Sequence, residues 1–314
     1  MKNISAAAAA SLVPMAKQTT QPTVILNRKN AFFNISSSIL ASDNLTYQVG
    51  EKLGEGGNAA VYECIESVSG DVFAVKFQLA LHGRRRERFG QEVELLKALH
   101  DPHIIAYIAD GSVNADIELK SNKGHRGPQN IKKLDIPFVI LPKALENLAQ
   151  HIKTKAPIPE ATYLGQILGL SKALTKVNAM ALHRDIKPEN VLVVGDTWAI
   201  SDFGLCDKVM ADADLSMADE MIGPIFWMSP EALNKRLGCT DVICEASDVF
   251  QMASIFWYAV CGRHPSGMVV AADWKGPAEL FPVIYKALLH TTADRFATSE
   301  EFHNALSGVI GTPV

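Results

Sequence analysis

The sequence lacks the features that define several classes of protein. Its five cysteines form no Cys-x-x-Cys pair and no even-numbered framework, which excludes a scaffold held by disulfides and favours reduced thiols in the cytoplasm. The net charge of −4 provides no strongly positive surface, so we expect no nucleic acid and no membrane as a partner. The longest apolar stretch, residues 249–262, is interrupted by Gln251 and Ser254, so it predicts a buried helix and no bilayer-spanning segment.

The first 44 residues carry little periodic order. They are rich in Ala, Ser, Thr and Asn, and an Ala-rich run after Lys2 only faintly resembles a signal peptide. Neither strand-like alternation nor helical spacing is sustained there. We therefore predict residues 1–44 as a flexible N-terminal tail.

Residues 45–77 contain short strand-like runs separated by turn residues. The runs lie at 47–49, 60–64 and 72–77, and a Ser-Gly-Asp turn at 69–71 separates the last two. This pattern predicts an antiparallel meander.

A helix is predicted over residues 84–99, where Glu92 shares a face with three leucines. Strand-like runs follow at 104–108 and 136–141. The polar stretch between them, residues 110–135, is rich in Lys and Arg and is predicted as a long loop. Such a loop is a solvated surface or a docking surface for a partner.

Beyond residue 142 the apolar spacing becomes helical. A long helix is predicted from Pro159 to Leu182. A strand pair at 191–194 and 198–201 is turned by Gly-Asp at 195–196, and helix predominates from there to the end.

The most informative run is HRDIKPEN at 183–190, followed by Asp-Phe-Gly at 202–204. This run and its spacing resemble the catalytic loop and metal-binding turn of the eukaryotic-type (Hanks-type) protein kinase family. The resemblance covers roughly residues 45–310 and implies a bilobal α+β fold. Residues 45–144 would form a small antiparallel sheet with one helix and the hinge, and residues 145–314 a larger, mainly helical lobe.

The resemblance assigns chemical roles to this loop. Asp185 would orient the substrate hydroxyl, Lys187 would balance charge on the transferred phosphoryl group, and Asn190 would complete the catalytic set. Asn190 and Asp202 would be metal ligands, since Mg²⁺ prefers oxygen and these residues offer an amide and a carboxylate. The implied cofactors are ATP and Mg²⁺, and the implied partner is a protein substrate.

The N-terminal half resembles the nucleotide-binding half of these kinases. Gly54 and Gly56 occupy a turn between strands, where backbone N–H groups can approach phosphates, although alanine stands where a third glycine is usual. Lys76, inside an apolar strand, requires a charged partner, and the resemblance implies a glutamate of the following helix. Glu92 faces inward, whereas Glu94 lies about 200° around the helix and faces solvent. The predicted nucleotide-binding residues are Leu53, Gly54, Gly56, Val61, Ala74, Lys76, Glu92, Leu141, Ala144 and Leu192.

Residues 202–231 resemble the activation segment of the family. Arg184 precedes the catalytic aspartate, an arrangement that the family links to control by phosphorylation. Two hypotheses follow: either Ser216 is phosphorylated and its phosphate pairs with Arg184, or acidic residues of the segment supply the charge permanently.

Two acidic residues are expected to support the helical lobe. The resemblance implies a structural ion pair between Glu231 and Arg295. Asp248 is expected to cap the buried helix beneath the catalytic loop.

Two observations bear on the hydroxyl that is phosphorylated. Lys187 resembles serine/threonine kinases, whereas Pro224 stands where their threonine is usual and is closer to tyrosine kinases. We give Lys187 more weight because it lies in the chemistry, and predict an ATP- and Mg-dependent serine/threonine kinase, with tyrosine or dual specificity as the alternative. An aminoglycoside-type phosphotransferase is less favoured, because such enzymes lack a long segment ending in Pro-Glu with a paired downstream arginine and this chain has both. A pseudokinase binding module is less favoured, because the key residues Lys76, Glu92, Asp185, Asn190 and Asp202 are all present.

Overall fold

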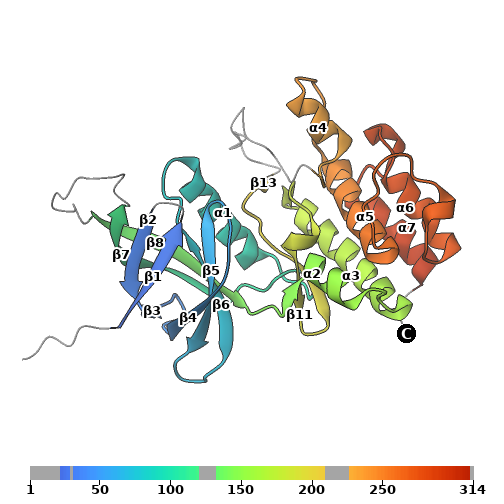
Figure 1. Ribbon diagram of the computed structural model, residues 1–314. Coiled ribbons are helices and arrows are strands. Elements are labelled where there is room, and N and C mark those ends of the chain that lie inside the picture. The colour runs from blue at the N-terminus through green and yellow to red at the C-terminus, as the bar shows by residue number, and fades with distance from the viewer. Residues whose placement is uncertain (1–21, 29–30, 120–131, 209–225, 312–314) are drawn as a thin grey trace, which may run out of the picture.

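The computed structural model describes residues 22–28, 31–119, 132–208 and 226–311, which form two lobes (Figure 1). Strands dominate the N-terminal lobe, and helices dominate the C-terminal lobe. This agrees with the expected α+β architecture, but the sheet is larger than the small one expected.

The N-terminal lobe contains an eight-stranded antiparallel sheet with the order β1-β2-β7-β8-β6-β5-β4-β3. Helix α1 (Arg84–Ala98) lies beside it and confirms the helix predicted over 84–99. The strands are β1 (Thr23–Arg28), β2 (Ala31–Ser36), β3 (Ser38–Leu40), β4 (Thr46–Glu55), β5 (Ala59–Glu66), β6 (Val72–Gln78), β7 (Ala109–Leu119) and β8 (Lys132–Pro142).

A single residue connects β2, the second strand at one side of this sheet, to β3, the edge strand at the other side. β2 ends at Ser36 beside β7, whereas β3 begins at Ser38 and pairs with β4 at the opposite edge. Between them, Ser37 donates its N–H to the carbonyl of Pro22 at 2.9 Å and accepts the N–H of Val49 at 2.8 Å. The sheet therefore curls until its edges approach, and its inward side chains enclose a core.

The structure corrects the tail predicted over residues 1–44, because residues 23–28, 31–36 and 38–40 form β1, β2 and β3. The inward side chains Leu26, Phe33 and Ile35 are at most 4% exposed. These strands are short, and β1 and β2 join the sheet through the pairing of β2 with β7, which is distant in sequence. Composition averaged over the segment therefore conceals them; residues 1–21 lie outside the described residues.

The loop predicted over 110–135 is corrected as well. β7 and β8 run through most of it in continuous antiparallel register. Val113, Ala115 and Ile117 alternate along β7 and pack in the core of the curled sheet, while the polar residues between them conceal the pattern. Residues 120–131 lie outside the described part of the chain, so a docking partner there stays a prediction.

The C-terminal lobe is built around the buried helix α5 (Glu245–Cys261), which confirms the helix predicted at 249–262. The predicted strand pair is β11 and β12, but residues 104–108 form only an isolated bridge at Ile104. The other helices are α2 (Leu148–Lys155), α3 (Glu160–Asn178), α4 (Pro230–Arg236), α6 (Phe281–Ala287) and α7 (Ser299–Ile310). The strands are β9 (Glu146–Asn147), β10 (Ala181–Leu182), β11 (Val191–Val194), β12 (Thr197–Ile200) and β13 (Asp207–Lys208), and the 3-10 turns are η1 (Pro188–Asn190), η2 (Ala271–Asp273), η3 (Ala278–Leu280) and η4 (Thr292–Asp294).

The described residues form two hydrophobic cores, one of which extends across both lobes. One fills the curled sheet, and the other joins α1 to the helices of the C-terminal lobe.

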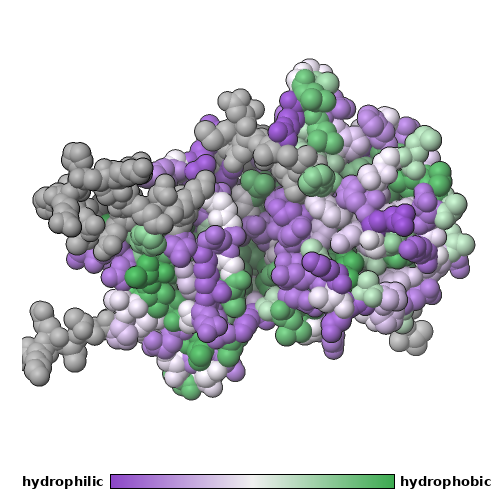
Figure 2. All heavy atoms as spheres, viewed as in Figure 1, coloured by the Kyte–Doolittle hydropathy of each residue, from purple (hydrophilic) through white to green (hydrophobic). Residues whose placement is uncertain are grey.

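Apolar side chains also gather on the outer end of α4, where Leu237 is 81% exposed (Figure 2). Within the described ranges, no helix combines the length and the apolar character needed to cross a bilayer.

Candidate active site

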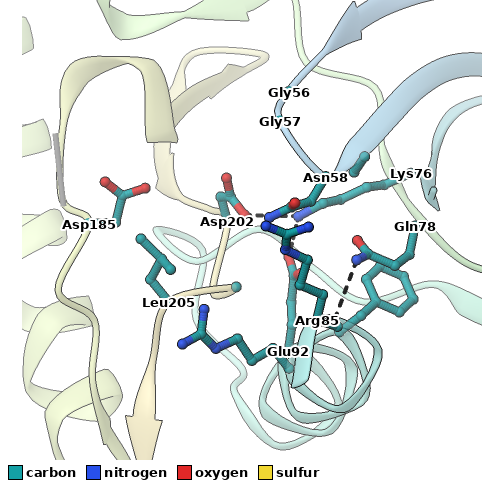
Figure 3. A pocket seen from close by; sticks show the side chains of 14 residues that line it. Gly56, Gly57, Asn58, Lys76, Gln78, Arg85, Glu92, Asp185, Asp202 and Leu205 are labelled. Atoms are coloured by element: carbon teal, nitrogen blue, oxygen red, sulfur yellow. Dashed lines mark hydrogen bonds and ion pairs between the residues drawn. The ribbon is translucent and has the colours of Figure 1, made fainter. Parts of the chain in front are cut away.

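Lys76 lies on β6 and joins two carboxylates from different parts of the chain (Figure 3). Its Nζ lies 2.6 Å from Glu92 Oε1 on α1 and 2.8 Å from Asp202 Oδ1. Burial disfavours the ammonium group, but the two carboxylates outweigh this effect and raise the pKa of Lys76. The cation is therefore held in the cleft in its charged form.

Glu92 and Glu94 lie on different faces of α1, and only Glu92 faces Lys76. Glu92 is 3% exposed and points into the cleft, whereas Glu94 is exposed and lies 3.4 Å from Lys97 on its own helix. This is the placement that the helical spacing predicts, because positions two apart lie about 200° around the axis.

Asp185, Lys187 and Asn190 converge in the loop that ends in η1. Asn190 Nδ2 donates to Asp185 Oδ2 at 2.8 Å and to its carbonyl oxygen at 2.9 Å, and Lys187 Nζ donates to Asp185 Oδ2 at 3.0 Å. Because Nδ2 is used in this way, Asn190 keeps its side-chain oxygen for another contact. Burial raises the pKa of Asp185, and Lys187 opposes that shift.

Asp248 holds the same loop from below. Its carboxylate accepts the backbone N–H of His183 at 2.7 Å, that of Arg184 at 2.9 Å, and Asn178 Nδ2 at 2.8 Å. The prediction that Asp248 caps its own helix is corrected, because in these contacts its side chain accepts hydrogen bonds from the catalytic loop and from Asn178. Arg184 has a φ of 67°, a costly value for a non-glycine residue, and the Asp248 contacts help to hold it there.

Asp202 also has a left-handed backbone, with a φ of 61°. The following Phe203 is 1% exposed and packs against His183, with ring centroids 5.1 Å apart. A Cβ at Gly204 would lie 3.4 Å from Asp202 Oδ1, so glycine keeps this turn uncrowded. The side chain of Asp202 is 47% exposed, and Lys76 lowers its pKa.

A cavity of about 210 Å³ lies between the glycine-rich turn, α1 and the two aspartates (Figure 3). Its lining includes Lys76, Asp185 and Asp202. Gly54 and Gly56 have open space where a Cβ would stand, so packing within the protein does not require glycine at either position. The missing side chains instead leave room for a ligand to approach the backbone.

Three predicted adenine contacts lie on the strands around Lys76. Val61 is opposite Lys76 on β5, and Ala74 is opposite Leu141 on β8. Cross-strand partners, and residues two apart on one strand, share a face of a sheet. Val61, Ala74 and Leu141 therefore lie on the same face as Lys76.

The remaining predicted nucleotide contacts come from three other segments. Leu53 lies near the end of β4 and is 46% exposed, and Ala144 follows β8 and is half-buried. Leu192 lies on β11 and packs, together with Leu141, against the core that joins the lobes.

The expected pair between Glu231 and Arg295 is present. Arg295 Nη1 and Nη2 donate to the two carboxylate oxygens of Glu231 at 2.9 and 2.8 Å. Both residues are buried in the C-terminal lobe, so the pair joins the start of α4 to the segment before α7.

The part of the chain that forms this site is similar in sequence to a known family. Residues 47–301 match the protein kinase domain family. The chain belongs to that family. It is 30% identical over 223 residues to the serine/threonine-protein kinase AfsK of Streptomyces coelicolor, and the matched region covers 70% of this chain and 25% of that protein. It is 24% identical over 276 residues to the serine/threonine-protein kinase PknH of Mycobacterium bovis, which covers 83% of this chain and 42% of that protein. The chain thus spans less than half of the length of these relatives.

Arg184 of this kinase domain forms an ion pair with Asp207, one of the acidic residues of the activation segment. Asp207 lies in β13, which pairs with β10 immediately before the catalytic loop. This contact favours the hypothesis that a permanent carboxylate serves Arg184. Ser216 and Pro224, on which the other hypotheses depend, lie outside the described residues.

Gln251 is a supporting residue of the kinase domain that the motifs do not reveal. Its Oε1 accepts the N–H of Ile186 at 3.2 Å, and its Nε2 donates to the carbonyl of Trp227 at 3.1 Å. It links the catalytic loop to the end of the activation segment. A polar residue inside an apolar helix is the sequence feature that could have pointed to it, because buried amides require partners.

Proposed function

We propose that this kinase domain transfers the γ-phosphoryl group of ATP to serine or threonine hydroxyls of proteins. The observation that carries the proposal is Lys76, which is bonded to both Glu92 and Asp202 at the cavity that Asp185 also lines. The relatives, named as serine/threonine-protein kinases, support the choice of hydroxyl. A cytoplasmic location, where ATP is available, belongs to the proposal.

Each residue then has a physical task. Lys76, held by Glu92, would bind phosphate oxygens of ATP, and the open backbone of the glycine-rich turn would contact the same phosphates. Asp185 would accept a hydrogen bond from the substrate hydroxyl and orient it for attack. Lys187, 3.0 Å from Asp185, would balance the negative charge of the moving phosphoryl group.

Asn190 and Asp202 would hold Mg²⁺. Asn190 bonds to Asp185 through Nδ2, which leaves its side-chain oxygen for a ligand, and the carboxylate of Asp202 is partly exposed at the cavity. Two protein oxygens are enough, because Mg²⁺ usually completes its shell with water and substrate phosphates. When bound, Mg²⁺ neutralises phosphate charge and orients the phosphoryl group.

A pseudokinase binding module is the competing function. The residues proposed to bind phosphate, to hold Mg²⁺ and to orient the hydroxyl are all present, which supports catalysis over binding alone. Tyrosine or dual specificity is the competing choice of acceptor.

The test is incubation of the full chain with labelled ATP, Mg²⁺ and a mixture of protein substrates, followed by phosphoamino-acid analysis. We expect phosphoserine and phosphothreonine with the wild type and none with Asp185→Asn. Nucleotide binding without label transfer would favour the binding module, and phosphotyrosine would overturn the proposed acceptor.

A further inference from the structure

The first turns of α1 are unusually rich in arginine. Four of the five residues from 84 to 88 are arginines, in a chain whose net charge is −4. Cations at the N-terminal end of a helix are opposed by the helix dipole, and Gly83 provides no side-chain cap there. Helix stability therefore does not account for this cluster.

Two of these arginines face the cleft. Arg85 and Arg88 precede Glu92 by seven and four residues, so all three share one face of α1. The bond between Glu92 and Lys76 fixes the rotation of the helix about its axis. Arg85 and Arg88 consequently line the same cavity as Asp185 and the glycine-rich turn.

The start of α1 is anchored to the strand that carries Lys76. Gln78 lies two residues after Lys76 and is 4% exposed. Its Nε2 donates to the carbonyl oxygen of Arg85 at 3.3 Å and to that of Ala80 at 2.9 Å (Figure 3). The backbone at the start of α1 is therefore fixed in position relative to β6, the strand that carries Lys76.

We propose that Arg85 and Arg88 form an anion-binding subsite for the protein substrate, so that the kinase selects acceptor sites with a carboxylate or phosphate nearby. This inference rests on the proposed function and names its substrate class. Arg85 lies about 10 Å along the axis from Glu92, a distance that an extended peptide covers in about three residues. The preferred anion is thus expected within a few residues of the acceptor hydroxyl.

The substrate is favoured over ATP as the source of the anion. Lys76 and the glycine-rich turn already provide contacts for the phosphates of ATP, and the arginines lie one and two turns of helix beyond Glu92. Leu205, which follows Gly204, also lines the cavity, so the arginines share this cavity with Asp185 and with the residues that follow Asp202.

The experiment is phosphorylation of a positional peptide library by the full chain, by Arg85→Ala, Arg88→Ala and the double variant. Arg86→Ala is the matched control, because it lies in the same turn about 100° away from Arg85 and is not among the cavity residues. We expect the wild type and the control to select Asp, Glu or phosphoserine at one or two positions. The ratio of kcat/KM for acidic over neutral peptides should fall about tenfold in the double variant.

Separate peptides with glutamate or phosphoserine at the selected position distinguish the two anions. The charge-reversed pair Arg85→Glu with Arg88→Glu should move the preference at that position toward lysine or arginine. This gain cannot arise from misfolding.

Two results would overturn the subsite. One is an acidic preference that is absent from the wild type or unchanged in the double variant. The other is an equal loss for every peptide with a raised KM for ATP, which would assign the arginines to the nucleotide. Absence of phosphorylation of any peptide by the wild type would overturn the proposed function itself and this inference with it.

Discussion

Two buried pairs of glutamate with a cation occupy the two lobes of this kinase domain and differ in how their hydrogen bonds are used. Glu92 and Glu231 are each 3% exposed. Arg295 directs two bonds to Glu231 and further bonds to the carbonyl oxygens of Ala246 at 3.0 Å and His290 at 2.7 Å. Lys76 is instead divided between Glu92 and the half-exposed Asp202.

The pKa values of the two glutamates move in opposite directions. Burial raises both, but for Glu231 the hydrogen bonds from Arg295 and Ser247 outweigh burial, and its pKa is lowered. For Glu92 the attraction of Lys76 does not outweigh burial, and its pKa is raised. A guanidinium group with five fixed donors can satisfy a buried carboxylate, whereas one shared ammonium group cannot. The first pair suits structure, and the second stays available to a ligand.

The largest expected effect is on stability, from breaking the saturated pair. Arg295→Ala should lower the free energy of unfolding by about 3–5 kcal/mol, because it leaves Glu231 buried without a cation. Urea denaturation measures this change. Arg295→Lys, which keeps the charge but not the fork, should lie between wild type and Arg295→Ala; equal stability of all three would contradict a structural role.

Breaking the shared pair should affect turnover more than stability. Asp202→Asn removes one of the two carboxylates of Lys76 and the charge proposed to hold Mg²⁺, so we expect kcat to fall about 10²–10³-fold. Steady-state kinetics with labelled ATP measures the loss of kcat. Urea denaturation should show a smaller change in the free energy of unfolding than Arg295→Ala causes. Glu94→Gln, on the exposed side of α1, is the matched control and should keep wild-type kcat.

Variants of the ion pair between Arg184 and Asp207 test whether a permanent carboxylate in the activation segment supports kinase activity. Asp207→Asn should lower kcat about tenfold, since Arg184 loses a charge-assisted hydrogen bond at the catalytic loop. Ser216→Ala should keep kcat within about twofold. The opposite ranking of these two variants would establish control by phosphorylation of Ser216.

The smallest expected effect is on the pH dependence of stability, to which the two buried glutamates contribute in opposite directions. The pKa of Glu231 lies below the ordinary 4.5 when folded, so its contribution to stability is complete above pH 4.5 and is lost as pH falls through the folded value. The pKa of Glu92 lies above 4.5 when folded, so its contribution is lost as pH rises through the folded value. Each unit of pKa difference corresponds to about 1.4 kcal/mol.

Urea denaturation of Glu231→Gln and Glu92→Gln between pH 4 and 7 measures these slopes. The destabilisation by Glu231→Gln should grow as pH rises, and that by Glu92→Gln should shrink. Parallel slopes would show that the two environments do not differ as we infer.

The sequence predicts the site better than it predicts the sheet. Asp185, Lys187 and Asn190 lie within six residues, and one helical face selects Glu92, so local geometry brings these groups into place. The strands β1, β2 and β3 could not be predicted, because each is short and because β1 and β2 join the sheet through β7, which lies far along the chain. The sequence predicted an acidic partner for Arg184 without singling out Asp207, and it placed Asp248 beneath the catalytic loop without predicting its bonds to that loop, because both contacts join segments far apart in the chain.

By itself, the sequence determined the chemical groups of this kinase domain and their order along the chain, since the motifs carry their own spacing. Only the tertiary structure decided that Arg184 meets Asp207, that Asp248 supports the catalytic loop, and that arginines of α1 line the cleft. These contacts join residues from different elements. Their formation depends on how helices and sheet pack, which no local pattern of residues specifies.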